Sequence, residues 1–312
     1  RVLPRAAKVG GSILIVYVAL TLLLALLLLL AGMSRFPALL HAMSAISCGG
    51  FSTSDGSIGQ WHKPAVDWVI LLGMLLGGAP FVIYLQLAQR RWRAVLCNSQ
   101  LRWYGAILLS AGLLIGFWLY IVLDVKPLPA IRHGLFTVTS VMTGSGFATL
   151  DWTGWTGIPL AVLFFISFIG GCAGSTSGGI KLFRLQILVA TARAQMARLM
   201  LPNAVLLPHY ERQPIPDQLA ESVLGFLFVY SLCFAFLAMG LGMAGLDFNS
   251  ALSAAASALA NLGPGFGPMV GPLGGFGQLP DLAKWLLTVG MLLGRLEMFI
   301  LLVLFAPSFW KP

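Results

Sequence analysis

Long hydrophobic runs recur along the chain, and they predict helices that cross a membrane. A stretch of about 20 mainly apolar residues is the length that spans the hydrocarbon core of a bilayer as an α-helix. Runs of this kind lie at about 12–31, 65–87, 103–123, from 158 onwards, 220–241 and 282–305. The pattern therefore predicts an all-α polytopic membrane protein with six full spans.

Three shorter hydrophobic runs follow the first, third and fifth long runs, and each ends in a glycine-rich stretch. Helices over 38–47, 129–142 and 248–260 would be too short to cross a bilayer. The stretches that follow them are Ser47–Ser52, Thr143–Ala148 and Asn261–Phe266. Non-helical backbone survives at membrane depth only where protein buries it or where it lines a water-filled cavity. We therefore expect three re-entrant pore helices, each leading into a loop beside an ion path.

The order of long helix, short helix, glycine loop and long helix occurs three times. Gly50, Gly146 and Gly263 mark equivalent points of the three copies, 96 and 117 residues apart. Self-similarity on this scale is the sequence signature of a repeat architecture. We expect three channel-like pore repeats, over residues 1–98, 99–200 and 201–312, with a glycine-rich helix break at 170–179 in the second.

Composition agrees with a membrane protein and changes the meaning of the net charge. The 312 residues are 58% hydrophobic and 9% charged, and the mean hydropathy is +0.90. The net charge of +9 does not indicate nucleic-acid binding, because the basic and acidic residues alternate between connections. The positive-inside rule then places both termini in the cytoplasm. The basic set is Arg1, Arg5, Lys8, Arg90, Arg91, Arg93, Arg102, Arg193, Arg198 and Arg212, and the acidic set is Asp55, Asp67, Asp124, Asp151, Asp247 and Asp281.

The three glycine loops are candidates for an ion selectivity filter. Backbone carbonyl oxygens can replace the hydration shell of a cation, and glycine permits the dihedral angles that turn them to one side. The short helices would also aim the partial negative charge of their C-terminal ends at the path. Glycines that only allow close helix packing are the alternative. The candidate cation-binding residues are Ser47, Cys48, Gly49, Gly50, Thr143, Gly144, Ser145, Gly146, Asn261, Leu262 and Gly263.

A second glycine-rich segment interrupts the helix expected from residue 158 to 195. So many glycines and hydroxyl residues do not sustain a stable helix. A phosphate-binding loop is excluded, because no Gly-Lys-Ser/Thr follows the glycines. The remaining alternatives are a passive kink and a loop that blocks or clears the ion path. The candidate gate residues of this loop are Gly170, Gly171, Gly174, Ser175, Thr176, Gly178 and Gly179.

Arg295 is an arginine inside the last predicted span. A charged side chain at membrane depth is costly and usually faces the bundle interior or water. Glu297 lies two residues on and points to another side of the helix. A buried ion pair or a side chain that reaches the interface is one interpretation. The other is a positive charge on the ion path that raises the barrier to cations.

Four motifs resemble the TrkH family of bacterial potassium-uptake subunits. In chain order they are His41–Thr53, Gly170–Lys181, Asn261–Gly265 and Gly294–Glu297. The resemblance covers essentially the whole chain. The family carries four helix–pore–helix units, and this chain matches the second, third and fourth, which suggests an N-terminally truncated piece. The family usually has Thr where this chain has Cys48.

The resemblance implies a potassium-channel-like fold and potassium transport across a bacterial inner membrane. It implies gating roles for the loop at 170–179 and for Arg295. It further implies a homodimer that binds a cytoplasmic TrkA-type nucleotide-binding regulatory subunit. Potassium would be the transported ion, with no covalent cofactor.

Two other classes of function are less well supported by the sequence. A secondary transporter with discontinuous helices, which couples a solute to Na⁺ or H⁺, also places broken helices at the midplane. It predicts inverted repeats, whereas these three units share one orientation. A membrane-embedded enzyme needs converging His, Asp, Glu or Cys residues within the spans. The spans hold mainly Arg295 and Glu297, so we expect no enzymatic activity.

Overall fold

The protein is almost entirely helical. The computed structural model describes residues 3–201, 207–211, 213–296, 298–304 and 309–310. A two-residue strand pair, β1 (His209–Tyr210) and β2 (Gln213–Pro214), is antiparallel and follows α9. The short elements between the main helices are η1 (Ser57–Trp61), α5 (Trp92–Leu96) and η2 (Phe276–Gln278).

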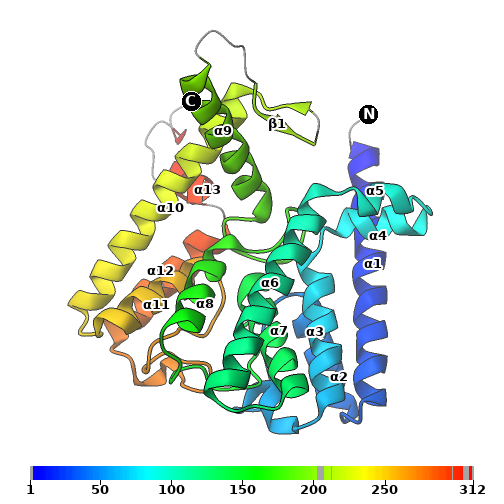
Figure 1. The fold of residues 1–312 in the computed structure, drawn as a ribbon, viewed down its shortest axis with the longest axis vertical. Coiled ribbons are helices and arrows are strands. Elements are labelled where there is room, and N and C mark those ends of the chain that lie inside the picture. Colours follow the sequence, from blue (N-terminus) through cyan, green and yellow to red (C-terminus); the bar gives the residue numbers. More distant parts are fainter. Residues whose placement is uncertain (1–2, 202–206, 212, 297, 305–308, 311–312) are drawn as a thin grey trace.

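Three long helices begin the three units that the sequence predicts. They are α1 (Leu3–Leu30), α6 (Ser99–Val122) and α10 (Asp217–Met243). Each contains an apolar window long enough to cross a membrane. In Figure 1 the N-terminal end of α1 lies at the same end of the molecule as α5 and the C-terminal end of α9. This end carries several of the basic connections noted in the sequence.

The second long hydrophobic run of each unit forms two helices. The pairs are α3 (Pro64–Gly78) with α4 (Phe81–Ala88), α8 (Ile158–Ile169) with α9 (Leu182–Met200), and α12 (Asp281–Arg295) with α13 (Met298–Leu304). The sequence predicted only the second break. By length and composition, the described residues hold three helices able to span a membrane, or four if α3 and α4 count as one. The count of six spans stays a prediction.

The first break has a clear local cause. The axis turns by 94° between α3 and α4. Gly77 and Gly78 weaken the helix, and Pro80 supplies no backbone N–H to continue it. The expected run over 65–87 is therefore two helices rather than one.

The three short helices pack against the longer ones. They are α2 (Arg35–Ile46), α7 (Pro127–Thr143) and α11 (Phe248–Ala260). α2 contacts α1 and α3, α7 contacts α6 and α3, and α11 contacts α10 and α12. Most of α7 and most of α11 is buried, whereas α2 exposes Phe36, Leu39 and Met43. In Figure 1, α7 lies in the middle of the molecule, with α2 beside α1 at one edge and α11 beside α12 at the other.

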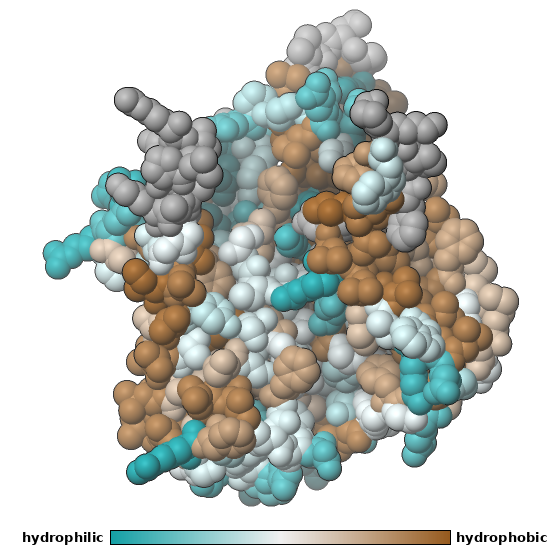
Figure 2. Space-filling view, turned by 180° about the vertical axis from the view of Figure 1, so that it is seen from behind, coloured by the Kyte–Doolittle hydropathy of each residue, from teal (hydrophilic) through white to brown (hydrophobic). Residues whose placement is uncertain are grey.

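The outer surface is widely apolar. Leu14, Ile15 and Leu22 on α1 and Phe228 and Phe236 on α10 are all more than half exposed. Figure 2 shows hydrophobic residues on both flanks at mid-height, with hydrophilic residues gathered towards the two ends. Exposed apolar area on this scale is costly in water. The surface fits a lipid environment.

Candidate functional site

The three glycine loops share one backbone hydrogen bond at equivalent positions. The N–H groups of Gly49, Ser145 and Leu262 donate to carbonyl oxygens five residues earlier, at 2.8, 3.0 and 2.9 Å. The acceptors are Ser44, Ser140 and Ser257. Each of these serines stands six residues before Gly50, Gly146 or Gly263. This serine spacing was not predicted, although the sequence contains it, and it marks the same local structure three times.

Left-handed backbone also recurs in the same two places of every loop. Cys48, Gly144 and Asn261 have φ of 52°, 72° and 55°. Two residues later stand Gly50, Gly146 and Gly263, called the marker glycines below. Their φ angles are 69°, 77° and 98°. Residues with a Cβ rarely adopt this region. Cys48 and Asn261 are therefore held there by the loop structure.

Contact between successive loops explains why two of the marker positions are glycine. A Cβ on Gly50 would collide with the carbonyl oxygen of Ser145, and a Cβ on Gly146 would collide with that of Leu262. At Gly263, no described atom lies within 4 Å of such a Cβ. The three loops therefore lie side by side in chain order. The structure brings together the residues that the sequence suggested for a filter.

Several carbonyl oxygens in these loops are left without a donor. Cys48, Gly144, Ser145 and Leu262 are buried residues. Their carbonyl oxygens accept no hydrogen bond from the residues that the structure describes. In buried residues, carbonyl groups without a partner are uncommon, because losing hydration costs free energy. A cation could supply the missing partner.

Serine hydroxyl groups donate hydrogen bonds to carbonyl oxygens of the second and third loops. Ser140 Oγ donates to the carbonyl oxygen of Phe147 at 2.6 Å, and Ser257 Oγ donates to that of Gly263 at 2.8 Å. The equivalent Ser44 Oγ is buried and has no partner among the described residues. The first loop therefore lacks a restraint that the other two have.

The glycine-rich segment between α8 and α9 lies against the first of these loops. Thr176 Oγ1 lies 2.8 Å from the carbonyl oxygen of Ile46, 3.1 Å from that of Gly77 and 3.3 Å from Cys48 Sγ. A hydroxyl group has one proton to donate, so the Cys48 thiol can in turn donate to Thr176 Oγ1. The predicted gate residue Thr176 thus contacts the predicted filter residue Cys48.

The same segment satisfies the backbone groups that the first helix break exposes. The N–H groups of Cys172 and Thr176 donate to the carbonyl oxygens of Gly78 and Gly77 at 3.0 and 3.2 Å. In return, the N–H of Phe81 donates to the carbonyl oxygen of Gly174 at 3.0 Å. Two broken helices therefore complete each other's hydrogen bonding, as membrane depth requires.

Arg295 reaches the same segment from α12. Its Nη1 donates to the carbonyl oxygen of Thr176 at 3.4 Å. Arg295, Tyr230 and the segment 175–179 border a cavity of about 220 Å³. The interpretation of Glu297 lies outside the described residues. The structure therefore places Arg295 beside the candidate gate residues of this segment.

Comparison with known proteins gives the same family over the whole chain. The family model TrkH, described as "Cation transport protein", matches residues 3–311. The Trk system potassium uptake protein TrkI of Halomonas elongata is 40% identical, over 100% of this chain and 63% of that protein. The Trk system potassium uptake protein TrkH of Escherichia coli (strain K12) is 34% identical, over 99% of this chain and 64% of that protein.

A solved structure agrees closely with this fold. The crystal structure of the potassium transporter TrkH from Vibrio parahaemolyticus matches with a TM-score of 0.91 and 34% identity. The match covers 99% of this chain and 66% of that chain. The present chain therefore spans slightly less than two thirds of the length of these relatives.

Proposed function

The chain belongs to the TrkH family of cation transport proteins, and on that premise we propose that it forms the potassium pathway of a Trk-type uptake system. The observation that carries the proposal is the set of buried loop carbonyl groups without donors, at Cys48, Gly144, Ser145 and Leu262. Oxygens of this kind can replace the water around a potassium ion while letting it leave again. The function involves no covalent step.

The short helices add to the attraction for a cation. α2, α7 and α11 each end at one of the glycine loops. The C-terminal end of a helix carries a partial negative charge. Three such ends around one path lower the free energy of a cation there. Ser47, Gly49, Thr143 and Asn261 complete the proposed filter set, with the marker glycines.

The segment 170–181 serves as the gate in this proposal. Thr176 Oγ1 contacts the carbonyl oxygen of Ile46, next to the first loop, and the positively charged Arg295 side chain contacts the carbonyl oxygen of Thr176. A cation that leaves the filter would meet this charge in its path. Opening then requires the segment and the Arg295 side chain to move together.

The remaining parts of the proposal rest on family membership and charge. We place the protein in a bacterial inner membrane, with both termini in the cytoplasm. Basic residues near α5 and α9 favour that side as the cytoplasmic one. A homodimer and a TrkA-type nucleotide-binding subunit are proposed from the family alone. Anionic lipid headgroups would also explain the basic connections.

The test is growth of a potassium-transport-deficient bacterium at limiting potassium. Two forms are compared: the 312-residue chain, and the chain extended to four repeats with the N-terminal first repeat of the 40% identical relative. Rescue by either form supports the proposal. Failure of both forms, with each present in the membrane, would overturn it.

A further inference from the structure

A buried ion pair joins two units of the protein away from the filter itself. Arg132 Nε lies 3.0 Å from Asp67 Oδ2, and the two side chains are 15% and 7% exposed. Asp67 lies in the first turn of α3, and Arg132 lies near the start of α7. By charge pattern alone, Asp67 is predicted to belong with the acidic residues of the connections. The structure instead places it inside the protein, opposite an arginine of the next unit.

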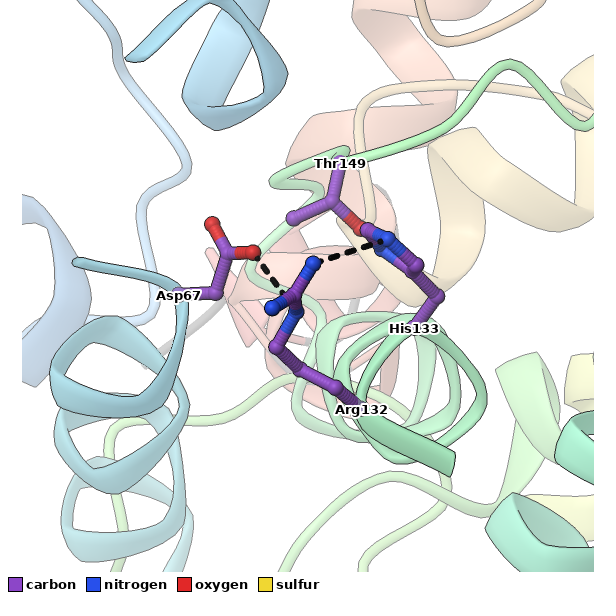
Figure 3. A network of polar contacts seen from close by, with 4 residues as sticks. All are labelled: Asp67, Arg132, His133 and Thr149. Atoms are coloured by element: carbon purple, nitrogen blue, oxygen red, sulfur yellow. Dashed lines mark hydrogen bonds and ion pairs between the residues drawn. The ribbon is translucent and has the colours of Figure 1, made fainter. Parts of the chain in front are cut away.

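Polar contacts extend from this pair towards the second glycine loop (Figure 3). Arg132 Nη2 lies 3.2 Å from His133 Nε2, and His133 Nδ1 lies 2.9 Å from Thr149 Oγ1. Arginine can only donate, so His133 Nε2 accepts and its Nδ1–H donates to Thr149. Nε2 can accept a hydrogen bond only when the ring is neutral, so these contacts describe the neutral imidazole.

Thr149 stands three residues after Gly146, in a segment that is fixed at further points. The N–H of Ala148 donates to Ser57 Oγ at 3.1 Å, and the carbonyl oxygen of Ala148 accepts from the N–H of Gly59 at 3.0 Å. Both partners belong to η1. The polar chain and η1 therefore attach the outer end of the second loop to the first unit.

We propose that Asp67 and Arg132 are positioning residues for ion selectivity, which act through His133 and Thr149 on the second glycine loop. The proposal rests on the potassium pathway proposed above. The pair fixes α7 against α3 at one end, and the His133–Thr149 contact fixes the segment just beyond Gly146. Selectivity depends on the size of the carbonyl ring and on how many oxygens reach the ion. Both change if this loop shifts.

The buried setting gives the pair its influence. Removing one partner leaves an uncompensated charge inside the protein, which then rearranges to reach water or another partner. Arg132 cannot rearrange without releasing His133, since it contacts both Asp67 and His133. The cavity of about 610 Å³ bordered by Asp67, Arg132, His133 and Thr149 gives the freed side chains room to move.

The experiment measures the ratio of K⁺ to Na⁺ flux in the transport-competent form of the chain. The variants are Asp67→Asn, Arg132→Gln, the two combined, Thr149→Val and Thr149→Ser. We expect the ratio to fall by about tenfold in the two single charge variants, which leave one charge unpaired. It should fall by a smaller factor in the combined variant, which leaves no unpaired charge, and in Thr149→Val. Thr149→Ser keeps the hydroxyl group and should keep the ratio. Lys284→Gln is the control, because it removes an exposed ion pair with Asp281.

Two outcomes separate a positioning role from a purely structural one. A structural role lowers the amount of protein in the membrane and leaves the ratio unchanged, which would overturn the inference. Thr149→Val introduces no unpaired charge, so it decides the matter even if the charge variants do not reach the membrane. If the unmodified protein carries no potassium flux, the proposed function fails, and this inference falls with it.

Discussion

Gly146 has space for a hydrogen atom and for nothing larger. A Cβ there would meet the carbonyl oxygen of Leu262 as well as Pro264 Cδ at 2.8 Å, and φ is +77°. Gly146→Ala should therefore push the second and third loops apart. We expect Rb⁺ uptake to fall by about tenfold or more, since a non-glycine residue in this region adds about 1–2 kcal/mol before any clash.

Gly245→Ala provides the matched comparison for Gly146→Ala. Gly245 also has positive φ, +96°, but no described atom lies within 4 Å of its Cβ position. The Gly245→Ala substitution adds backbone strain outside the glycine loops. Rb⁺ uptake should therefore stay near the level of the unmodified protein. Equal losses in the two variants would show that strain, rather than contact between the loops, is responsible.

The Thr176 hydroxyl group fastens the proposed gate to the first loop. Thr176→Val keeps the shape of the side chain and removes the one hydroxyl proton that lies between the carbonyl oxygens of Ile46 and Gly77. A net loss of about 1 kcal/mol should favour the released segment and raise flux by about fivefold. Thr176→Ser restores the donor and should restore the original rate. Unchanged flux in Thr176→Val would mean that this contact does not hold the gate.

Arg295 supplies the charge that a cation meets below the filter in the proposed pathway. Arg295→Ala removes that charge together with the hydrogen bond to the Thr176 carbonyl oxygen. Flux should rise by about tenfold, because one charge beside a partly desolvated path repels a passing cation. Arg295→Lys keeps the charge and should stay closer to the unmodified rate. If the flux of Arg295→Ala equals that of the unmodified protein, Arg295 is not part of the gate.

At the level of elements, the sequence predicted the short helices well. The helix expected over 248–260 has the same bounds in α11, because Asp247 begins it and the glycine loop ends it. The break between α3 and α4 was not predicted, although Gly77, Gly78 and Pro80 provide a local signal. Its hydrogen-bond partners lie about 95 residues further along the chain. A local pattern contains no information about such partners, nor about the pairing of Asp67 with Arg132.

The cap of α11 is a test of helix stability that does not depend on transport. Asp247 Oδ2 accepts from the N–H of Ser250 at 3.1 Å, and its contacts with Ser250 hold the pKa of the carboxyl group below its ordinary value. Asp247→Ala should lower the free energy of unfolding by about 1 kcal/mol. Asp247→Asn should lose less. Thermal unfolding of the purified protein measures both.

The pH dependence of this cap follows from the direction of the pKa shift. A lowered pKa in the folded protein means that the cap stabilises above the unfolded pKa, near 3.8. That stabilisation is lost as pH falls through the folded pKa. The difference in unfolding temperature between the protein and Asp247→Ala should therefore shrink below pH 4. A difference that grows on acidification would contradict the role of the carboxylate.

For the whole molecule, labelling of the exposed Cys97 can determine which end faces the cytoplasm. Cys97 is exposed, Cys48 and Cys172 are buried, and Cys233 is partly exposed on α10. Cys97 follows α5, at the end where the basic connections gather (Figure 1). The proposed topology puts that end in the cytoplasm, because positively charged connections are retained there. A membrane-impermeant maleimide should then label Cys97 in inverted membrane vesicles and leave it unlabelled in intact cells. Cys97→Ser should abolish this labelling, whereas labelling of Cys97 in intact cells would reverse the orientation of every loop in the proposed pathway.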